Sequence, residues 1–305
     1  MSNLNAPHFQ VADRAREYLE AVRWPNGPIC PHCGSVSEDH YALQGKAHRV
    51  GLWKCKDCRE QFSVTVGTVF ERSKIKLNVW LQAVFLLCSS KKGISSHQLH
   101  RTLGVTYKTA WFMSHRIREA FKSEPSGPLG GSGKIVEADE TYYGNKKGRK
   151  VLQGFGHKHS IAALVERDGA VRSFHVVEVN RESLRAVVLG NADRKSHLMT
   201  DEHKQYIKIG REFKKHTSVN HGEKEYARGT TSTNTIEGYF SILKRGLIGT
   251  YFHVSGDHLQ RYCHEFDFRY SNRSALGIED AERTKIALQG IGGKRLTYRR
   301  TVSAQ

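Results

Sequence analysis

Four cysteines in two closely spaced pairs place the strongest constraint on how this chain can fold. The pairs are Cys30-Pro-His-Cys33 and Cys55-Lys-Asp-Cys58, and 21 residues separate them. Two thiolates three positions apart can bind one tetrahedral Zn²⁺ from a tight turn, and Gly34 permits the sharp turn after the first pair. A redox dithiol needs only one pair, and disulfides are not expected in a chain without a secretion signal. We therefore predict a structural zinc ribbon with Cys30, Cys33, Cys55 and Cys58 as the Zn²⁺ ligands.

The residues after the second pair have the character of a β-strand. In residues 61–70, apolar side chains alternate at Phe62, Val64 and Val66. We assign residues 1–72 to an N-terminal helix and the zinc ribbon. The remaining cysteines, Cys88 and Cys263, have no partner at ligand spacing and are expected to be small buried apolar residues.

Residues 73–121 are expected to form three helices, with the last two arranged as a helix-turn-helix. Gly104 marks the turn between these two helices, and Thr106 can cap the second one. Such a helix can read a DNA groove through exposed residues near its start and along one side. The residues expected to do so are Tyr107, Lys108, Thr109, His115, Arg116 and Arg118.

The charge of the chain favours a polyanionic partner. Lys and Arg number 48 against 30 Asp and Glu, which gives a net charge of +18. Basic residues recur along the chain rather than in one block, as extended contact with double-stranded DNA would require. A basic surface that serves only solubility is the alternative.

The apolar runs of the chain do not predict a membrane protein. None approaches the roughly 18 residues that a membrane-spanning helix needs. The first twenty residues are polar and have no signal-peptide pattern. We therefore expect no membrane partner, and expect the protein to stay in the compartment where it is made.

A segment rich in glycine, proline and serine marks a domain boundary. Residues 122–134 contain two prolines, four glycines and three serines, a composition that cannot sustain a helix or a strand. We predict a linker there. At the other end, residues 276–305 are basic and punctuated by glycine, and we assign them to a C-terminal tail without a stated role.

Between the linker and the tail, strand and helix patterns alternate. The chain shows a strand at 134–139, a hairpin that turns at Asp168-Gly169, a helix capped by Asn180, and a short buried strand before further helices. This order predicts an α/β domain with one mixed sheet over residues 135–275.

Three acidic residues of this domain follow the order strand Asp, strand Asp, helix Glu. Asp139 and Asp201 end predicted strands, and two parallel neighbouring strands would bring both to the same edge of a sheet. Glu237 borders an apolar helical stripe made of Ile236, Phe240, Leu243 and Leu247. Each acid taken singly is also compatible with a turn or a solvated surface, and there are rival carboxylates close by, namely Glu137, Glu140 and Glu202.

Three carboxylates brought together would repel one another unless a cation lay among them. Oxygen ligands without a His or Cys cluster suit Mg²⁺ or Mn²⁺ rather than Zn²⁺. Two such ions, about 3.5–4 Å apart, can hold the attacking and leaving oxygens of an in-line phosphoryl displacement. The acids Asp139, Asp201 and Glu237 therefore predict a divalent-metal site for phosphoryl transfer.

The zinc ribbon, the helix-turn-helix and three stretches of the α/β region resemble a known family. The stretches EADETYYG, MTDEHKQY and STNTIEGYFSILKRGLIGTYFHVSGDHLQRYCHEFDFRYSNR are similar to those of DDE-type transposases of bacterial insertion sequences. The resemblance is to the ISXO2-like branch, which has an N-terminal zinc ribbon and a lysine after the third acid. It covers essentially residues 20–275.

The resemblance implies a ribonuclease-H-like catalytic domain. Its three acids correspond here to Asp139, Asp201 and Glu237, and its trailing lysine corresponds to Lys244. The resemblance also implies Mg²⁺-dependent cutting and strand transfer of the terminal inverted repeats of the element, by a homodimer or a larger homo-oligomer. The expected location is the bacterial cytoplasm, in association with the nucleoid.

Basic residues outside the helix-turn-helix are further candidates for DNA contact. Lys244 lies about 10 Å beyond Glu237 on the same side of its helix, where it can hold a DNA phosphate. The basic, glycine-rich loop at 144–159 can grip a strand or can equally be a solvated insertion. The candidates in these regions are Lys146, Lys147, Arg149, Lys244 and Arg245, with Tyr142, Tyr143 and Tyr239 either stacking on nucleotides or belonging to the core.

Two alternatives to a transposase are left open by the residues themselves. One is a non-catalytic regulator that binds DNA and uses the sheet domain only for assembly. The other is a nuclease of the same fold that cuts but does not join strands. Cutting and joining use the same carboxylates and metal ions, so the sequence does not separate them.

Overall fold

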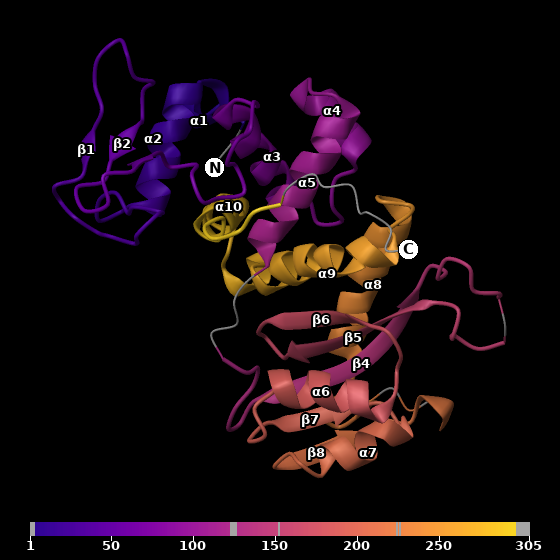
Figure 1. Ribbon diagram of the computed structural model, residues 1–305. Coiled ribbons are helices and arrows are strands. Elements are labelled where there is room, and N and C mark those ends of the chain that lie inside the picture. The colour runs from indigo at the N-terminus through magenta and orange to yellow at the C-terminus, as the bar shows by residue number, and fades with distance from the viewer. Residues whose placement is uncertain (1–3, 123–126, 152, 224, 226, 297–305) are drawn as a thin grey trace. The chain divides into compact units, whose positions relative to one another are not determined.

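The chain forms two compact units. The computed structural model describes residues 4–122, 127–151, 153–223, 225 and 227–296 (Figure 1). The first unit consists of the amino-terminal part up to residue 122 together with the segment that begins at Glu279, and the second unit extends from residue 123 to Ile278. Residues 123–126 of the predicted linker lie outside the described residues.

The first unit begins with two helices and the cysteine-bearing strands. Its opening elements are α1 (Pro7–Gln10), α2 (Ala12–Arg23), β1 (Tyr41–Ala42), β2 (Trp53–Lys54) and β3 (Gln61–Phe62), and the three strands pair antiparallel in that order. The prediction of an alternating strand after the second cysteine pair was wrong beyond Phe62. The chain turns there, with the Val66 N–H donating to the Ser63 carbonyl and Gly67 in the left-handed region at φ +68°.

Three helices follow at the positions that the sequence predicts. They are α3 (Leu77–Ser89), α4 (Ser96–Leu103) and α5 (Tyr107–Phe121). Gly104 ends α4 in the left-handed conformation, at φ 64°, which costs a glycine little. The Thr106 hydroxyl caps α5 by accepting the Thr109 N–H at 3.2 Å. Leu99 and Ile117 are fully buried between these helices.

The region predicted as a C-terminal tail contains a helix that completes the core of the first unit. This helix, α10 (Asp280–Gln289), packs against α2, α3 and α5. Its Leu288 is fully buried, and the Arg283 guanidinium donates to the Cys88 carbonyl at 3.0 Å. The segment after α10 continues the packing, because the Val69 N–H donates to the Ile291 carbonyl.

The second unit is built on a five-stranded mixed sheet with strand order β6-β5-β4-β7-β8. Strands β4, β5 and β6 pair antiparallel, whereas β7 is parallel to both β4 and β8. The elements in chain order are β4 (Ile135–Tyr143), β5 (His159–Glu166), β6 (Val171–Val176), α6 (Arg181–Asn191), β7 (His197–Thr200), α7 (Lys204–Gly210), β8 (Lys215–Ser218), η1 (His221–Glu223), β9 (Ala227–Arg228), β10 (Thr231–Ser232), α8 (Asn234–Gly249), α9 (Gly256–Ser271) and η2 (Ser274–Leu276).

Most of the predicted elements of this unit are present. Asp168 turns the β5–β6 hairpin at φ 55°, and the Asn180 side chain caps α6 by accepting the Ser183 N–H at 2.8 Å. Strand β8 was not predicted. Its sequence, Lys-His-Thr-Ser, carries no apolar residue because the strand lies at the edge of the sheet and is not fully covered on either face.

The sheet is covered by helices on both faces (Figure 1). Side chains of β5 alternate between two hydrophobic cores, because neighbouring residues in a strand point to opposite faces. Ile161, Ala163 and Val165 pack with residues of α8 and α9, whereas Ala162 and Leu164 pack with residues of α6 and α7. Glu137 and Asp139 of β4 pair with residues of β5 that pack against α8, so the two acids lie on the face of the sheet that this helix covers.

No helix in the described parts of the chain is both long enough and apolar enough to cross a membrane.

We expect α10 to stabilise the first unit. Replacing the buried Leu288 with Ala should lower the free energy of unfolding of that unit by about 2–5 kcal/mol. All four tryptophans lie between Trp24 and Trp111, so tryptophan fluorescence during urea denaturation reports on this unit alone. Lys285→Ala, on an exposed position of the same helix, is the control. Equal midpoints for the two variants would contradict a structural role for α10.

Candidate functional site

The four paired cysteines gather at one point of the first unit. Their sulfur atoms all lie within 4.8 Å of one another, and Sγ of Cys30 is 3.7 Å from that of Cys58, as Cys33 is from Cys55. A tetrahedral site with Zn–S bonds of about 2.3 Å places its sulfur atoms about 3.8 Å apart. The cluster therefore fits one Zn²⁺ ion.

The chemistry of the thiols supports metal binding. Burial raises the pKa of the Cys55 thiol, but hydrogen bonds from the backbone N–H groups of Cys58 and Asp57 and from neighbouring thiols outweigh it and lower the pKa to about 6, whereas burial and the neighbouring thiols raise the pKa of Cys33 and of Cys58. A thiolate is the form that binds metal. His32, inside the first pair, is exposed, and its ring contacts the Gln61 carbonyl at 3.2 Å instead of pointing into the cluster.

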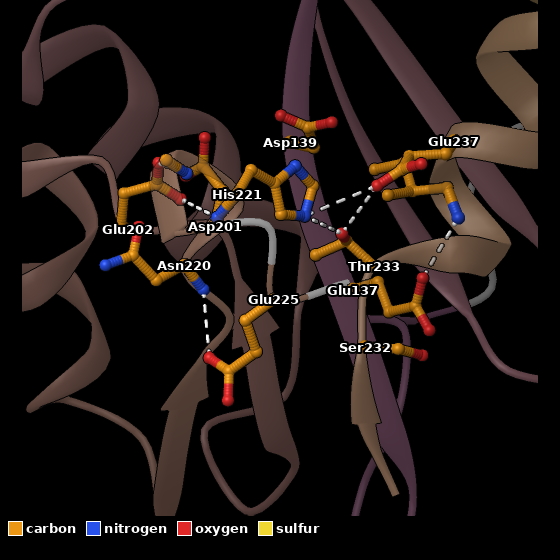
Figure 2. Close-up of polar contacts among 12 residues, drawn as sticks. Glu137, Asp139, Asp201, Glu202, Asn220, His221, Glu225, Ser232, Thr233 and Glu237 are labelled. Atoms are coloured by element: carbon orange, nitrogen blue, oxygen red, sulfur yellow. Dashed lines mark hydrogen bonds and ion pairs between the residues drawn. The ribbon is translucent and has the colours of Figure 1, made fainter. Parts of the chain in front are cut away.

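The carboxylates predicted as metal ligands lie on three elements of the second unit. Asp139 is on β4, and Asp201 directly follows the last residue of β7. Because β4 and β7 are parallel neighbours with Glu137 opposite Met199, continuing the register by two residues places Asp139 level with Asp201. Glu237 lies in the first turn of α8, as Figure 2 shows.

The environment of Asp139 disfavours its negative charge. Burial raises the pKa of this carboxyl to about 8, with further contributions from Asp201, Glu140 and Glu237. Burial also raises the pKa of Asp201, against the opposing effects of the His203 backbone N–H and the His203 and His221 side chains. A cation bound among these acids would relieve the repulsion, and hard oxygen donors suit Mg²⁺ or Mn²⁺.

The three acids are spread more widely than the thiols. In the described residues, the cysteine cluster is the only group of three or more potential ligands whose atoms all lie within 4.8 Å of one another. The carboxylates therefore affect one another electrostatically without forming a tight cluster. The residues fit an oxygen-ligated divalent ion by their chemistry and their placement at one edge of the sheet.

Glu137, a rival carboxylate in the sequence, has a structural role. It is fully buried, and its Oε1 accepts a hydrogen bond from Nε of Arg167 at 2.6 Å. Its Oε2 accepts the backbone N–H of Ile236 in the first turn of α8 at 3.0 Å. Thr233, at the N-cap position of α8, makes no capping bond itself. Glu137 therefore caps α8 from a neighbouring strand and fixes the helix that carries Glu237.

The other two rival carboxylates are also occupied by structural contacts. Glu140 accepts a hydrogen bond from the buried Tyr206 hydroxyl at 2.7 Å. Glu202 accepts the backbone N–H groups of His221 and Gly222 at 2.9 and 3.0 Å. The proposed ligands make local contacts of their own, since Asp139 accepts the Glu140 N–H at 2.7 Å and Asp201 accepts the His203 N–H at 3.0 Å, each through one carboxylate oxygen.

Glu237 has two side-chain neighbours that the sequence analysis did not single out. The buried Thr233 hydroxyl donates to Oε1 of Glu237 at 2.9 Å, and Nε2 of His221 lies 3.5 Å from the same oxygen (Figure 2). Thr233 carries a sequence signal, because a threonine directly before a helix is a typical N-cap residue. His221 carries none.

The helix of Glu237 has the predicted amphipathic character. The four stripe residues are buried: Ile236, Phe240, Leu243 and Leu247. Lys244 is half-buried on α8, and Arg245 is exposed and donates to the Ser241 carbonyl at 3.1 Å. Tyr143 and Tyr239 are buried in the same core, which supports the core alternative for both.

The predicted DNA-reading face of α5 needs a correction. Tyr107 and Lys108 are exposed and Thr109 is half-buried, but three of the residues predicted to be exposed are buried: His115, Arg116 and Arg118. They lie on the side of α5 that packs into the first unit. The Arg116 guanidinium donates to the Glu71 carbonyl at 2.7 Å and stacks over Trp80, and Arg118 donates to the Ser114 hydroxyl.

A basic groove runs along the start of α5. It has a volume of about 300 Å³, and its lining includes Arg72, Lys74, Trp80, Lys108, Phe112 and Arg116. Arg72 and Lys74 are exposed. Cationic and aromatic side chains together are the components of many nucleic-acid contacts.

The basic loop between β4 and β5 is partly held in place. The Lys146 ammonium donates to the Val177 carbonyl at 3.0 Å, whereas Lys147 and Arg149 are exposed. The ring of Phe155 stacks on Tyr142 at 4.4 Å between centroids, so Tyr142 already has an aromatic partner within the protein.

Comparisons with known proteins match a stretch of each of the two units. Residues 128–271 match the family described as ISXO2-like transposase domain, and residues 12–61 match the transposase zinc-ribbon domain. A protein of Halobacterium salinarum, described as an uncharacterized protein in transposable element ISH50, is 30% identical to this chain over 279 residues. The match covers 86% of this chain and 91% of that protein.

Zinc should be bound only while the cysteine cluster is intact. Cys58→Ser should abolish binding of the one zinc ion per chain, measured by elemental analysis, and should change the tryptophan fluorescence. The fluorescence should respond because Trp24 packs edge-on against Trp53 and Phe62 beside the cluster. His32→Ala, a substitution between two ligands, is the control and should retain zinc. Full zinc content in the Cys58 variant would contradict the assignment.

The raised pKa of Asp139 predicts how stability depends on pH without divalent ions. The folded protein holds the proton up to about pH 8, and the unfolded chain releases it near pH 4. This group's contribution to stability is therefore complete below pH 4 and is lost as pH rises to about 8. Asp139→Asn should remove that loss and make the protein more stable than wild type at pH 8.

Chemical denaturation of the zinc-loaded protein, followed by far-UV circular dichroism, measures this effect. Mg²⁺ should be omitted and not chelated, because a chelator would also remove the zinc. Glu182→Gln, an exposed acid on α6, is the control and should behave as wild type. An Asp139→Asn protein that is less stable than wild type at pH 8 would refute the electrostatic account.

Proposed function

The chain belongs to the ISXO2-like transposase family, and on that premise we propose that it binds the terminal inverted repeats of its own element and catalyses metal-dependent strand cleavage and strand transfer. The observation that carries the proposal is the adjacency of Asp139 and Asp201 on parallel strands, with Glu237 facing them from α8. The order of the five strands supports a ribonuclease-H-like fold for the second unit. The residues fit the phosphoryl-transfer chemistry that this fold would carry.

In this proposal, Asp139, Asp201 and Glu237 hold Mg²⁺ or Mn²⁺. When bound, such ions activate the attacking oxygen and stabilise the leaving oxygen of a phosphoryl displacement. The protein contributes the positions of the three carboxylates. Glu137 and Arg167 fix the start of α8 against β4, so the carboxylates on the two elements are held in place before DNA binds.

In this proposal, basic side chains of the second unit contact the phosphates of the DNA strand. Lys244 lies seven residues after Glu237, about 10 Å along α8, where its ammonium can neutralise a phosphate next to the reacting one. Lys147 and Arg149 on the β4–β5 loop are exposed and available for further phosphate contacts. Arg245 is exposed on α8 and extends the same basic side.

The first unit recognises the DNA ends in this proposal. Tyr107, Lys108 and Thr109 remain at or near the surface at the start of α5, and the basic groove beside them adds Arg72 and Lys74. Each phosphate that is neutralised contributes roughly 0.9 to the log–log dependence of binding on salt. The net charge of +18 supports extended contact of this kind. We further propose that at least two copies of the chain act together, because the element has two ends.

Loss of one acid should separate catalysis from DNA binding. On labelled duplexes that carry the ends flanking this gene, wild-type protein should cut only when Mg²⁺ is added. Asp201→Asn should cut at least about 100-fold more slowly, and both proteins should bind the DNA with affinities that agree within about twofold, because the contribution of the metal ligands is made at the reacting phosphate. Glu182→Gln is again the exposed-acid control.

Different outcomes of this assay distinguish the candidate functions. Cleavage retained by the Asp201 variant would refute the assignment of the acids. Tight, salt-sensitive binding without cleavage by any of the proteins would favour a DNA-binding regulator. Cleavage without joined products, when a target duplex is supplied, would favour a nuclease.

A further inference from the structure

The loop after β8 brings a histidine to the carboxylates. Strand β8 is parallel to β7, so the chain leaving it emerges at the same edge of the sheet as Asp201. The Val219 N–H donates to the Thr200 carbonyl at 3.1 Å, which keeps the two strand ends together. The next turn, η1, starts at His221, and Figure 2 shows the His221 ring between the Asp201 region and Glu237.

The backbone of this histidine is fixed by several hydrogen bonds. Glu202, the neighbour of Asp201, accepts the N–H groups of His221 and Gly222. The Asn220 N–H donates to Glu225 at 3.1 Å, and the Asn220 side chain accepts the Glu223 N–H at 3.3 Å. These hydrogen bonds fix the backbone from which the His221 ring projects.

The ring approaches one particular oxygen of the third acid. Nε2 of His221 is 3.5 Å from Oε1 of Glu237 and 3.3 Å from the Thr233 hydroxyl, which itself donates to the same Oε1. Both contacts use one carboxylate oxygen and leave Oε2 of Glu237 able to bind a cation. The Glu237 side chain is 42% exposed, so without these neighbours it would sample several rotamers.

We propose that His221 is a positioning residue that, together with Thr233, holds the Glu237 carboxylate in the orientation that binds the divalent cation. An imidazole whose Nε2 carries a proton can donate to Oε1 in its neutral and in its charged form, so the role needs no change of protonation. Orienting a ligand before binding reduces the entropy that the ion must overcome, and partners of metal ligands typically contribute about 10–100-fold in affinity. The inference rests on Glu237 being a ligand of the proposed cation.

The test is Mn²⁺ binding by the full-length, zinc-loaded protein, measured by electron paramagnetic resonance without DNA. His221→Ala should weaken the affinity about 10-fold, whereas His221→Gln, which keeps an N–H donor of similar reach, should stay within about threefold of wild type. His253→Ala, an exposed histidine in the loop between α8 and α9, is the control and should bind as wild type. DNA binding without divalent ions should be unchanged in all three.

A second readout detects the contact itself. In zinc-loaded protein without Mn²⁺ or Mg²⁺, labelled with ¹⁵N at histidine, Glu237→Gln should shift the ring nitrogen signals of His221 and leave those of His253 in place. Unchanged His221 signals would refute the contact. Wild-type affinity in His221→Ala would refute the positioning role, and equal losses in the Ala and Gln variants would show that the imidazole itself binds the ion.

Failure of the proposed function gives a different result. If wild type and Asp201→Asn bind Mn²⁺ equally weakly, the acids do not form a cation site. The positioning role then falls together with the proposed function, even when the nitrogen signals show the His221–Glu237 contact to be present.

Discussion

The buried contact between Glu137, Arg167 and the start of α8 determines where the acids proposed as metal ligands lie. Glu137 is two residues before Asp139, and the N–H group that it accepts belongs to Ile236, the residue before Glu237. Burying a carboxylate is costly, but here a guanidinium, a backbone donor and the positive end of the helix dipole offset the cost. Removing one partner of such a pair costs about 3–5 kcal/mol, so β4 and α8 cannot move apart easily. The spacing of Asp139 and Glu237, which repel each other, is therefore set by Glu137, whose two carboxylate oxygens both accept hydrogen bonds.

The rest of the second unit supplies the stability that this arrangement needs. Strand β5 is buried on both faces, and its alternating side chains join two separate hydrophobic cores. Asp139 lies beside the core that α8 and α9 form with the sheet, and Asp201 follows the end of the neighbouring strand β7. Burial there raises the pKa of Asp139 and also reduces screening by water, which strengthens any interaction between the acids and a cation. The same environment therefore destabilises the charged carboxylates when no cation is present, and it favours the binding of a metal ion by them.

Sequence patterns predicted the features that depend on local chemistry. The cysteine spacing, the Asn180 and Thr106 caps, the Asp168 turn and the apolar stripe of α8 are each determined by a few neighbouring residues, and the structure confirms them. Features that depend on tertiary packing were missed. Strand β8 has no apolar residue, so periodicity could not reveal it, and with it the approach of His221 to Glu237 stayed hidden. The basic residues His115, Arg116 and Arg118 were expected at the surface but are buried, and the Arg116 guanidinium lies over the Trp80 ring and donates to a backbone carbonyl.

At α10 the chain returns to the first unit, so a single cut does not divide the chain into its two units. The second unit is inserted between two parts of the first, because Glu279 and the residues after it complete the core around α3. Cutting the chain after residue 121 would leave α10 attached to the second unit with Leu288 exposed to water, at a cost of about 1.5–3 kcal/mol for this side chain. The amino-terminal piece would lose the same contacts. A fragment that contains the first unit therefore has to include both segments, and a fragment that contains only the second unit has to end before α10.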